Sequence, residues 1–192
     1  MTCIIGMIDK ENDCVWIGGD SLGSNGYTKA IQSQSKVFRN KIFKNVVMGS
    51  TGTFRHIDLL KYSDKLFDEI DMYKNTELNH EYMVTKFIPN VITLFKEGII
   101  EENRGGNFII GAGNKLFEIQ TDYSVLEPLL GFCSVGSGED IAMGSMITTK
   151  DMNLTVPKKI ELALKAAEEC SCGVQRPFTI INTKNEEVVV IK

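Results

Sequence analysis

The chain has 192 residues, of which 43% are hydrophobic and 24% charged, a composition typical of an ordinary globular protein with enough length to bury a substantial core. The formal net charge of -4 argues against nucleic acid as the main partner, because phosphate binding usually requires a basic face and no run of Lys or Arg supplies one. The apolar stretches are too short to cross a bilayer and the N-terminus has no basic segment followed by an apolar one, so we expect no membrane partner and a cytoplasmic location.

The first fifty residues are predicted to form strands separated by turns. Four strands are expected, at residues 3–8, 14–20, 36–38 and 43–49. The first two flank the polar turn 9–13 and are therefore predicted to pair as a hairpin. The segment 21–27 contains two glycines and is predicted to be a loop.

The pattern then changes to helical spacing. Apolar residues recur at helical intervals over 54–70 and again over 82–95, where Pro89 is expected to kink the second helix. Residues 105–120 return to strands around a Gly-Ala-Gly-Asn turn, a hairpin signal.

Two more helices and a last hairpin complete the chain. One helix is expected to start at Gly136-Ser137-Gly138, followed by two acids that the helix dipole favours, and the other at Pro157. Residues 178–181 and 188–191 are predicted to form the closing hairpin. The chain shows no repeat and no linker, so we expect one domain over residues 1–192.

The order of these elements predicts the fold class. Strands, two helices, strands, two helices and strands follow one another in segregated runs rather than as alternating βαβ units. Such runs favour an α+β fold with two antiparallel sheets. The dense Val and Ile content indicates that each sheet is apolar on both faces, and a four-layer αββα sandwich satisfies that requirement.

Thr2 is a candidate nucleophile. Removal of Met1 is chemically reasonable because the next side chain is small, and it would leave Thr2 with both a hydroxyl and a free α-amine. An α-amine, with an unperturbed pKa of about 7.7 to 8.0, can serve near neutral pH as the base that activates the hydroxyl. Such a site also needs a cation, an acid that holds the cation, and N–H donors for an oxyanion. Lys36, Asp20 and the turn from Gly49 to Gly52 are the candidates.

Several short motifs follow one another in a characteristic order. They are Thr2-Cys3-Ile4-Ile5-Gly6, Gly18-Gly19-Asp20-Ser21, Lys36-Val37, Ser50-Thr51-Gly52-Thr53, Val135-Gly136-Ser137-Gly138 and Ala142-Met143-Gly144. Each is weak by itself, but together they resemble the N-terminal-nucleophile hydrolases of the proteasome β-subunit type. The greatest likeness is to the bacterial HslV peptidase and its HslV-like relatives, over nearly the whole chain.

The resemblance implies a role for each matching residue. Thr2 would be the nucleophile of a threonine-type endopeptidase, Asp20 the acid that orients the site, and Lys36 the cation. Ser137 would help to bind the α-amine. The oxyanion amide of the family's Ala-Gly-Gly turn falls at Thr51 or Gly52, and one Gly of that turn is replaced here.

A second departure from the family lies after the last helix. The family often has an Asp with a Ser three residues later, whereas Glu168 and Ser171 occupy that spacing here; a solvated helix end explains this pair about as well. The resemblance requires no cofactor and leaves open a monovalent cation, Na⁺, near Ser171.

The resemblance also implies substrates and partners. The substrate would be a peptide or an unfolded protein, and the assembly a homo-oligomeric ring of hexamers, single or stacked, served by an AAA+ ATPase that unfolds substrates. The residues that would line the substrate pocket are Gly23, Gln34, Phe38, Gly49 and Thr53. Gly49, which lacks a side chain, predicts a roomy pocket.

Other interpretations of the same residues remain open. Thr2 can be a solvated terminus, Asp20 a turn acid and Lys36 a surface lysine on an edge strand. The family also contains inactive members, so the alternative function is a non-catalytic assembly or scaffold subunit. A third reading, an amidase of another N-terminal-nucleophile branch, is disfavoured because Cys3 lies one residue too late.

The remaining candidates for chemistry are assigned structural roles. The five cysteines are expected to be reduced thiols. Cys170-Ser171-Cys172 resembles half of a metal site, but no His or CxxC partner stands nearby in the sequence, and structural zinc requires four ligands. His56 and His80 lie in polar, helix-like surroundings and are predicted to be surface residues.

Overall fold

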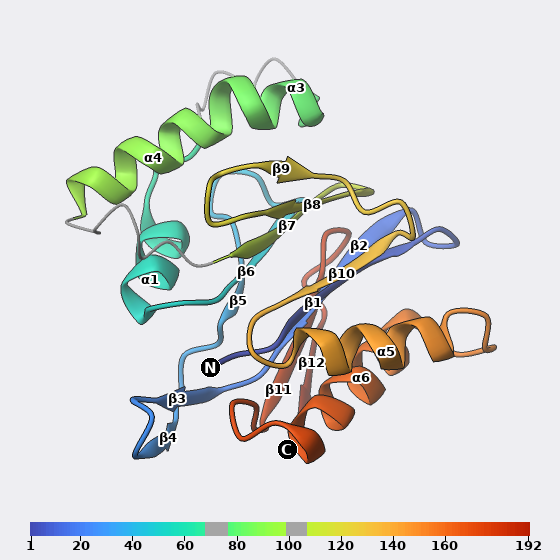
Figure 1. Cartoon of the computed structure of the whole chain (residues 1–192). Coiled ribbons are helices and arrows are strands. Elements are labelled where there is room, and N and C mark those ends of the chain that lie inside the picture. The colour runs from blue at the N-terminus through green and yellow to red at the C-terminus, as the bar shows by residue number, and fades with distance from the viewer. Residues whose placement is uncertain (68–76, 99–106) are drawn as a thin grey trace.

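Two five-stranded antiparallel sheets form the middle of the molecule in the computed structural model, which describes residues 1–67, 77–98 and 107–192 (Figure 1). The first sheet has the order β10 (Phe132–Val135), β1 (Ile4–Asp9), β2 (Cys14–Gly19), β11 (Phe178–Asn182) and β12 (Val188–Ile191). The second has the order β5 (Val37–Arg39), β6 (Val46–Ser50), β7 (Phe108–Ala112), β8 (Lys115–Ile119) and β9 (Val125–Leu126). A separate hairpin consists of β3 (Leu22–Ser24) and β4 (Lys29–Ile31).

Helices cover the outer face of each sheet. One layer contains α1 (Phe54–Tyr62), α3 (His80–Tyr82), the π-helical turn η1 (Met83–Phe87) and α4 (Ile88–Glu97). The other contains α5 (Glu139–Thr149) and α6 (Val156–Cys170). In Figure 1 the two sheets lie between these helix layers. The predicted four-layer αββα sandwich is therefore confirmed.

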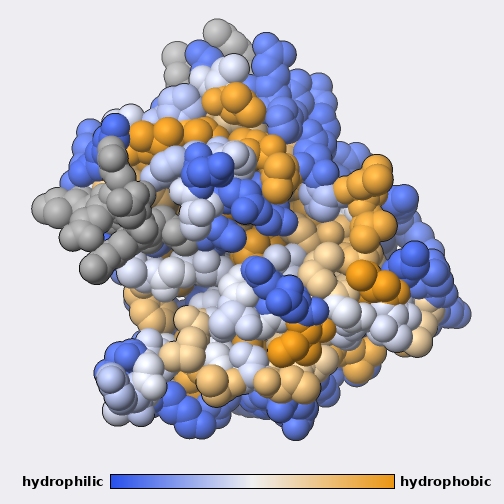
Figure 2. Space-filling model, in the orientation of Figure 1, coloured by the Kyte–Doolittle hydropathy of each residue, from blue (hydrophilic) through white to orange (hydrophobic). Residues whose placement is uncertain are grey.

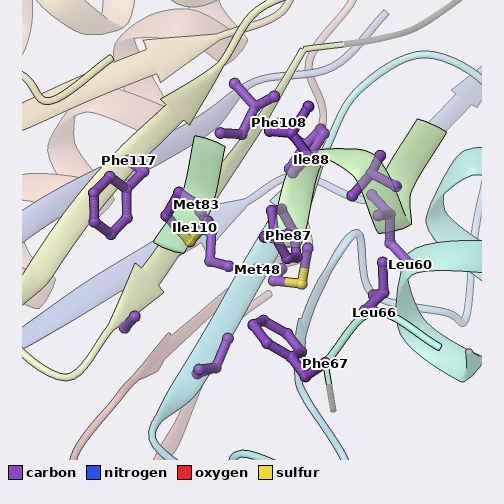
Figure 3. Packing of buried hydrophobic residues seen from close by; sticks show 14 of the residues in the cluster. Met48, Leu60, Leu66, Phe67, Met83, Phe87, Ile88, Phe108, Ile110 and Phe117 are labelled. Carbon is purple, nitrogen blue, oxygen red and sulfur yellow. The ribbon is translucent and has the colours of Figure 1, made fainter. Parts of the chain in front are cut away.

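Three apolar interfaces hold the four layers together. Ile4 and Ile17 of the first sheet meet Val47 and Ile109 of the second between the sheets. Figure 3 shows the interface between the second sheet and its helices, where Phe87 of η1 packs near Met48 and Phe108. The third interface joins α5 and α6 to the first sheet. Strands β2, β6, β7 and β10 are buried on both faces, as their composition predicts, whereas the edge strands β9 and β12 are partly exposed.

The outer surface is mixed in character. Figure 2 shows hydrophobic patches among hydrophilic ones on the face it presents. None of the helices in the described parts of the chain combines the length and the apolar character that spanning a bilayer requires.

The predicted hairpins are present, with register between Ile4 and Gly19 in β1–β2 and between Ala112 and Lys115 in β7–β8. The prediction of a loop over 21–27 is wrong, because Leu22–Ser24 forms β3 and pairs with β4. Gly26, with φ of 96°, allows the tight turn between these strands. The strands β9 and β10 were not predicted.

The helix expected over 54–70 is shorter than its apolar pattern. It ends at Tyr62, because Ser63 adopts an extended conformation. The Ser63 amide makes the last helical hydrogen bond, to the Leu59 carbonyl. Residues 68–70 lie outside the described residues. The helix expected over 82–95 begins earlier, at His80, where the Asn79 side chain caps it.

Pro89 lies just after an irregular turn, the π-helical η1. The Ile88 amide bonds to the Met83 carbonyl, five residues back, so the helix is widened there. Proline has no N–H and crowds the carbonyl four residues earlier. A widened turn immediately before it relieves that crowding.

His56 is buried rather than on the surface, which corrects the prediction. It is 1% exposed and its ring lies 4.9 Å from that of Phe95. Neither ring nitrogen has a hydrogen-bond partner among the described residues, and burial lowers the pKa of His56. His80 is exposed and lies 3.1 Å from a carboxylate oxygen of Glu127.

Candidate active site

The start of β1 lies inside the molecule, where the chain enters the layered structure. Thr2 is only 3% exposed. Because β1 pairs with β2 so that Ile4 faces Gly19, the residue after β2, Asp20, comes next to the first residues of the chain. The Asp20 amide donates to the Cys3 carbonyl at 3.3 Å, which continues the ladder to this point.

The Asp20 carboxylate is fixed by backbone amides. Its Oδ1 accepts from the Cys3 amide at 3.0 Å and its Oδ2 from the Leu22 amide at 2.9 Å. Asp20 is 1% exposed. Two backbone amides therefore fix the position of this carboxylate beside Thr2.

The cation is the ammonium of Lys36, the residue that precedes β5. The Lys36 carbonyl accepts from the Ser50 amide at 3.2 Å, which ties the residue to the end of β6. Nζ lies 2.9 Å and 3.1 Å from the two carboxylate oxygens of Asp20 and 3.0 Å from Thr2 Oγ1. Lys36 is 2% exposed, so this charge pair is shielded from water.

Two opposing effects act on Lys36. Burial, the larger one, lowers the pKa of its ammonium, and the charge and hydrogen bonds of Asp20 raise it. The net shift is downward. A weakly solvated ammonium next to a hydroxyl favours the deprotonated hydroxyl by charge attraction, because little water screens the interaction.

The turn between β10 and α5 holds the backbone of Thr2. The Thr2 nitrogen donates to Ser137 Oγ at 3.1 Å, and the Gly138 amide donates to the Thr2 carbonyl at 3.2 Å. Gly136 has φ of 105°, and a Cβ there would lie 2.3 Å from the Thr2 carbonyl oxygen. Only glycine fits this approach.

Met1 covers the site. Its carbonyl oxygen accepts a hydrogen bond from Lys36 Nζ at 3.3 Å and another from the Thr2 hydroxyl. With Met1 in place the Thr2 nitrogen is a peptide amide and cannot act as a base. The residue itself is 43% exposed, so it lies at the mouth of the site rather than in the core.

The two candidates for the oxyanion donor differ in their partners. The Thr51 amide donates to the Asn107 carbonyl at 3.0 Å, and the Thr51 hydroxyl donates to the same oxygen at 2.8 Å. The Gly52 amide has no acceptor among the described residues, and Gly52 has φ of 86°. Of the two amides, that of Thr51 is thus occupied, whereas that of Gly52 is left without a partner in the described parts of the chain.

The structure does not bring Glu168 to Thr2. The amide and the side-chain Nε of Arg176 donate to the two oxygens of Glu168 at 2.8 Å and 2.7 Å. Burial opposes ionisation of Glu168, but the bonds and charge of Arg176 outweigh it and lower the pKa. Ser171 follows α6, and its Oγ accepts from the Gly173 amide at 3.2 Å.

The predicted substrate-pocket residues differ in burial. The inference that Gly49 leaves a roomy pocket is wrong, because a Cβ there would lie 2.5 Å from Ile4 and 2.8 Å from Val37 in the core between the sheets. Phe38 is buried in the core under the helices. The other three are the buried Gly23 and the exposed Gln34 and Thr53; Thr53 caps α1.

Sequence reasoning missed two contributors to the site. The Asn107 carbonyl accepts the hydrogen bond of the Thr51 amide, but no sequence motif marks Asn107. Gly173 is buried, and a Cβ there would lie 2.3 Å from Ser137 Oγ. Its position after a helix end is a typical place for glycine, but the contact depends on how the chain folds back.

The Cys3 thiol, next to Thr2 in the chain, is not in its reactive form. Burial raises the pKa of the Cys3 thiol to about 12, with the Ser134 hydrogen bond opposing this shift. Cys3 is therefore a neutral thiol near neutral pH. Within the described ranges no three His, Cys, Asp or Glu side chains are arranged to hold a metal ion.

The fold is similar to that of solved proteasome-like structures. Thiobacillus denitrificans BPH in complex with epoxomicin matches with a TM-score of 0.72 at 16% identity, over 93% of this chain and 97% of that chain. A second structure of Thiobacillus denitrificans BPH matches with a TM-score of 0.70 at 18% identity, over 95% of this chain and 97% of that chain. Eukaryotic HslV from Trypanosoma brucei gives 0.68 at 20% identity, over 94% and 98%.

These likenesses establish the fold. The chain has the HslV-like N-terminal-nucleophile hydrolase fold over almost its whole length. No protein-family model matches the sequence, and no curated protein sequence matches it. The activity must therefore be argued from the residues of the site.

Proposed function

We propose that the chain is a threonine-type endopeptidase that uses Thr2 as its nucleophile after removal of Met1. The observation that carries the proposal is the buried Lys36 ammonium, 3.0 Å from Thr2 Oγ1 and paired with Asp20. A solvated terminus, a turn acid and a surface lysine would each be exposed, whereas all three residues are at most 3% exposed. Burying a charge pair such as Asp20 and Lys36 is costly unless the pair is well hydrogen-bonded. The presence of this pair next to the Thr2 hydroxyl therefore supports a chemical role.

The proposed reaction begins with a proton transfer. Once Met1 is removed, the Thr2 α-amine accepts the proton of Oγ1, and Oγ1 attacks the carbonyl carbon of a peptide bond. The C–O bond forms as the carbonyl π electrons move to the oxygen. Collapse of this intermediate breaks the C–N bond, and the amine leaving group takes the proton. Water then attacks the ester in the same way, releasing the acid and restoring Thr2.

The Gly52 amide is the proposed donor to the oxyanion. Of the two candidate amides it is the one without a partner among the described residues, and it lies on the turn between β6 and α1. A preorganised donor of this kind typically contributes about 10²–10³ in rate. Ser137, which accepts from the Thr2 nitrogen here, would keep its contact with that nitrogen once it becomes the amine.

The assembly and the partners are part of the proposal. By likeness to HslV and BPH, the subunit would act in a homo-oligomeric, self-compartmentalising ring in the cytoplasm on unfolded polypeptide delivered by an ATPase. The alternative is an inactive scaffold subunit. Such a subunit would keep Met1, whose carbonyl oxygen accepts hydrogen bonds from Lys36 Nζ and from the Thr2 hydroxyl.

Intact mass of the natively expressed protein separates the two. We expect loss of Met1, followed by one adduct on treatment with epoxomicin, the ligand of the BPH structure. Thr2→Ala should lose Met1 and gain no adduct. Thr121→Ala, a change at an exposed Thr in a turn, should gain the adduct like the wild type. A chain that keeps Met1 and stays unlabelled would favour the scaffold.

A further inference from the structure

The loop after α6 lies against the candidate site. Gly173 is buried, and a Cβ added to it would lie 2.3 Å from Ser137 Oγ and 3.1 Å from the Met1 side chain. Ser137 Oγ is the acceptor for the Thr2 nitrogen. The position of Gly173 therefore limits where the Ser137 hydroxyl can lie.

The far end of this loop is anchored firmly. Arg176 is bonded to Glu168 of α6 through its amide and its side chain. The Gln175 carbonyl accepts from the Ser21 amide at 3.1 Å, and its side chain accepts from Lys29 Nζ at 2.9 Å. A conformational change in the loop must therefore be absorbed at its near end, between the end of α6 and Gly173.

Two exposed thiols flank the residue at that near end. Cys170 is the last residue of α6 and Cys172 lies two positions later, and both are exposed, whereas the other three cysteines are buried. Ser171 between them is extended, with φ of -125° and ψ of 122°. An extended residue places the side chains before and after it on the same side of the backbone.

The two cysteines lie farther apart than the commonest disulfide separation of about 5.5 to 6 Å. Two extended steps separate their Cα atoms by roughly 6.6 Å, near the upper end of the range for disulfides of about 4.4 to 6.8 Å. Closing the bond at the usual separation shortens this span, so Ser171 must leave its extended conformation. Its Oγ and carbonyl, which accept from the amides of Gly173 and Val174, would then lose their present geometry.

We propose that Cys170 and Cys172 form a reversible thiol–disulfide site that controls the candidate active site through Gly173. A small-molecule disulfide such as oxidised glutathione is the co-reactant. One cysteine thiolate attacks it, forms a mixed disulfide and releases one glutathione thiolate. The second cysteine thiolate attacks the mixed disulfide and releases another. Two protein thiols are oxidised, one glutathione disulfide is reduced to two thiols, and the two protein protons end on the glutathione thiolates.

The effect on the active site rests on the proposed function. Oxidation displaces Gly173 from Ser137 and so disturbs the hydroxyl that positions the Thr2 nitrogen. Labelling of the processed chain by epoxomicin should slow by roughly tenfold to 100-fold, since a misplacement of about 1 Å can cost that much. Dithiothreitol should restore the rate.

The test uses the full-length processed protein, equilibrated in glutathione buffers of increasing oxidised fraction. Peptide mass mapping should show loss of two hydrogens on the peptide that contains both thiols, in step with the loss of labelling. The variants Cys170→Ser and Cys172→Ser should label in every buffer at the rate of the wild type with reduced thiols, because neither variant can form the internal disulfide. A glutathione adduct that persists on the wild type instead of an internal disulfide would overturn the proposal.

A readout independent of activity separates this proposal from the proposed function. Hydrogen exchange of the Gly138 amide, which donates to the Thr2 carbonyl, should speed up on oxidation in the wild type and not in the Ser variants. If the reduced wild type never reacts with epoxomicin, the peptidase proposal fails while the disulfide and the exchange change remain measurable. A disulfide that forms and leaves both labelling and Gly138 exchange unaltered would overturn the control role.

Discussion

The pairing of Asp20 with Lys36 concentrates two full charges in a site that water does not reach. Asp20 receives two backbone amides besides the ammonium, so its position depends on main chain rather than on mobile side chains. The Lys36 ammonium instead donates to Asp20, to the Thr2 hydroxyl and to the Met1 carbonyl. The acid thus positions the cation, and the cation acts on the hydroxyl.

Replacing Lys36 should damage both stability and reactivity. Lys36→Met leaves the Asp20 carboxylate buried without its cation, and loss of one partner of a buried pair typically costs about 3–5 kcal/mol in the free energy of unfolding. Urea unfolding measures this loss, and epoxomicin labelling followed by mass should fall below detection.

The double variant Asp20→Asn with Lys36→Met distinguishes a chemical role from a structural one. Without either charge, the free energy of unfolding should recover much of the loss, since a neutral pair avoids the desolvation cost. Labelling should not recover, because no cation remains beside Thr2. Recovery of labelling together with stability would show that the charge pair serves only the fold.

His56 gives the fold a dependence on pH. Burial lowers its pKa below the ordinary value of 6.5, so between the folded pKa and 6.5 the unfolded state binds more protons than the folded state. Stability therefore rises with pH up to about 6.5 and is lost below it.

The variant His56→Leu removes this dependence, together with two buried ring nitrogens that have no partner in the described part of the chain. The difference in the free energy of unfolding between the variant and the wild type should grow in favour of the variant as the pH falls below 6.5. It should grow by up to about 1.4 kcal/mol per pH unit, until the pH reaches the pKa of His56 in the folded protein. Urea unfolding from pH 8 to pH 5 tests it. Parallel stability curves for the two proteins would contradict the assignment.

At the scale of elements, the turn between β6 and α1 supplies the proposed oxyanion donor. Gly52 adopts φ of 86° there, and a Cβ in the left-handed region costs about 1–2 kcal/mol. We expect Gly52→Ala to lose that much stability and also to slow labelling, because relieving the strain turns the amide away.

Gly113→Ala is the matched control for this prediction. Gly113 also has positive φ, 59°, in the turn between β7 and β8, and a Cβ there would meet only Asn45 at 3.9 Å. Its stability loss should be similar and its labelling rate unchanged. Equal slowing in both variants would assign the effect to lost stability rather than to the oxyanion donor.

The sequence predicts those elements whose pattern is local. Strands β1 and β2 are recognisable because a polar turn separates two β-rich runs, and α6 because Pro157 precedes an apolar stripe. Strand β10 has only four residues, too few for a periodic pattern, and it is stabilised by pairing with β1 from the start of the chain. The hairpin β3–β4 has little apolar character, and Leu22 is its only large buried side chain, so its glycines indicated a loop.

At the scale of the molecule, the resemblance identified Thr2, Asp20, Lys36 and Ser137, which the structure brings together. It could not place Glu168, because the partner Arg176 lies in a loop whose path depends on tertiary packing. Nor could it choose between Thr51 and Gly52, since the choice depends on Asn107, fifty-six residues after Thr51. Whether Gly49 faces a pocket or the core depends on how the two sheets pack together, which no local sequence pattern reveals.

One surface feature bears on the proposed assembly. Large hydrophobic side chains are exposed, among them Leu129, Leu130, Ile147 and Met152, and exposed apolar patches often mark protein interfaces. If the subunits assemble as the likeness to HslV implies, native mass spectrometry should give a multiple of six subunits. Leu129→Asp, at a fully exposed position, should lower the oligomeric state while leaving the circular dichroism spectrum unchanged. A monomer at all concentrations would contradict the ring.

The enclosed chain start has a practical consequence for making the protein. Thr2 is almost fully buried, and Lys36 bonds to the carbonyl of the residue in front of it. Any affinity tag fused to the N-terminus would have to leave through the opening that Met1 now fills, and it would keep the Thr2 nitrogen in a peptide bond. The C-terminal residue Lys192 is exposed and follows the edge strand β12, so a purification tag belongs at that end.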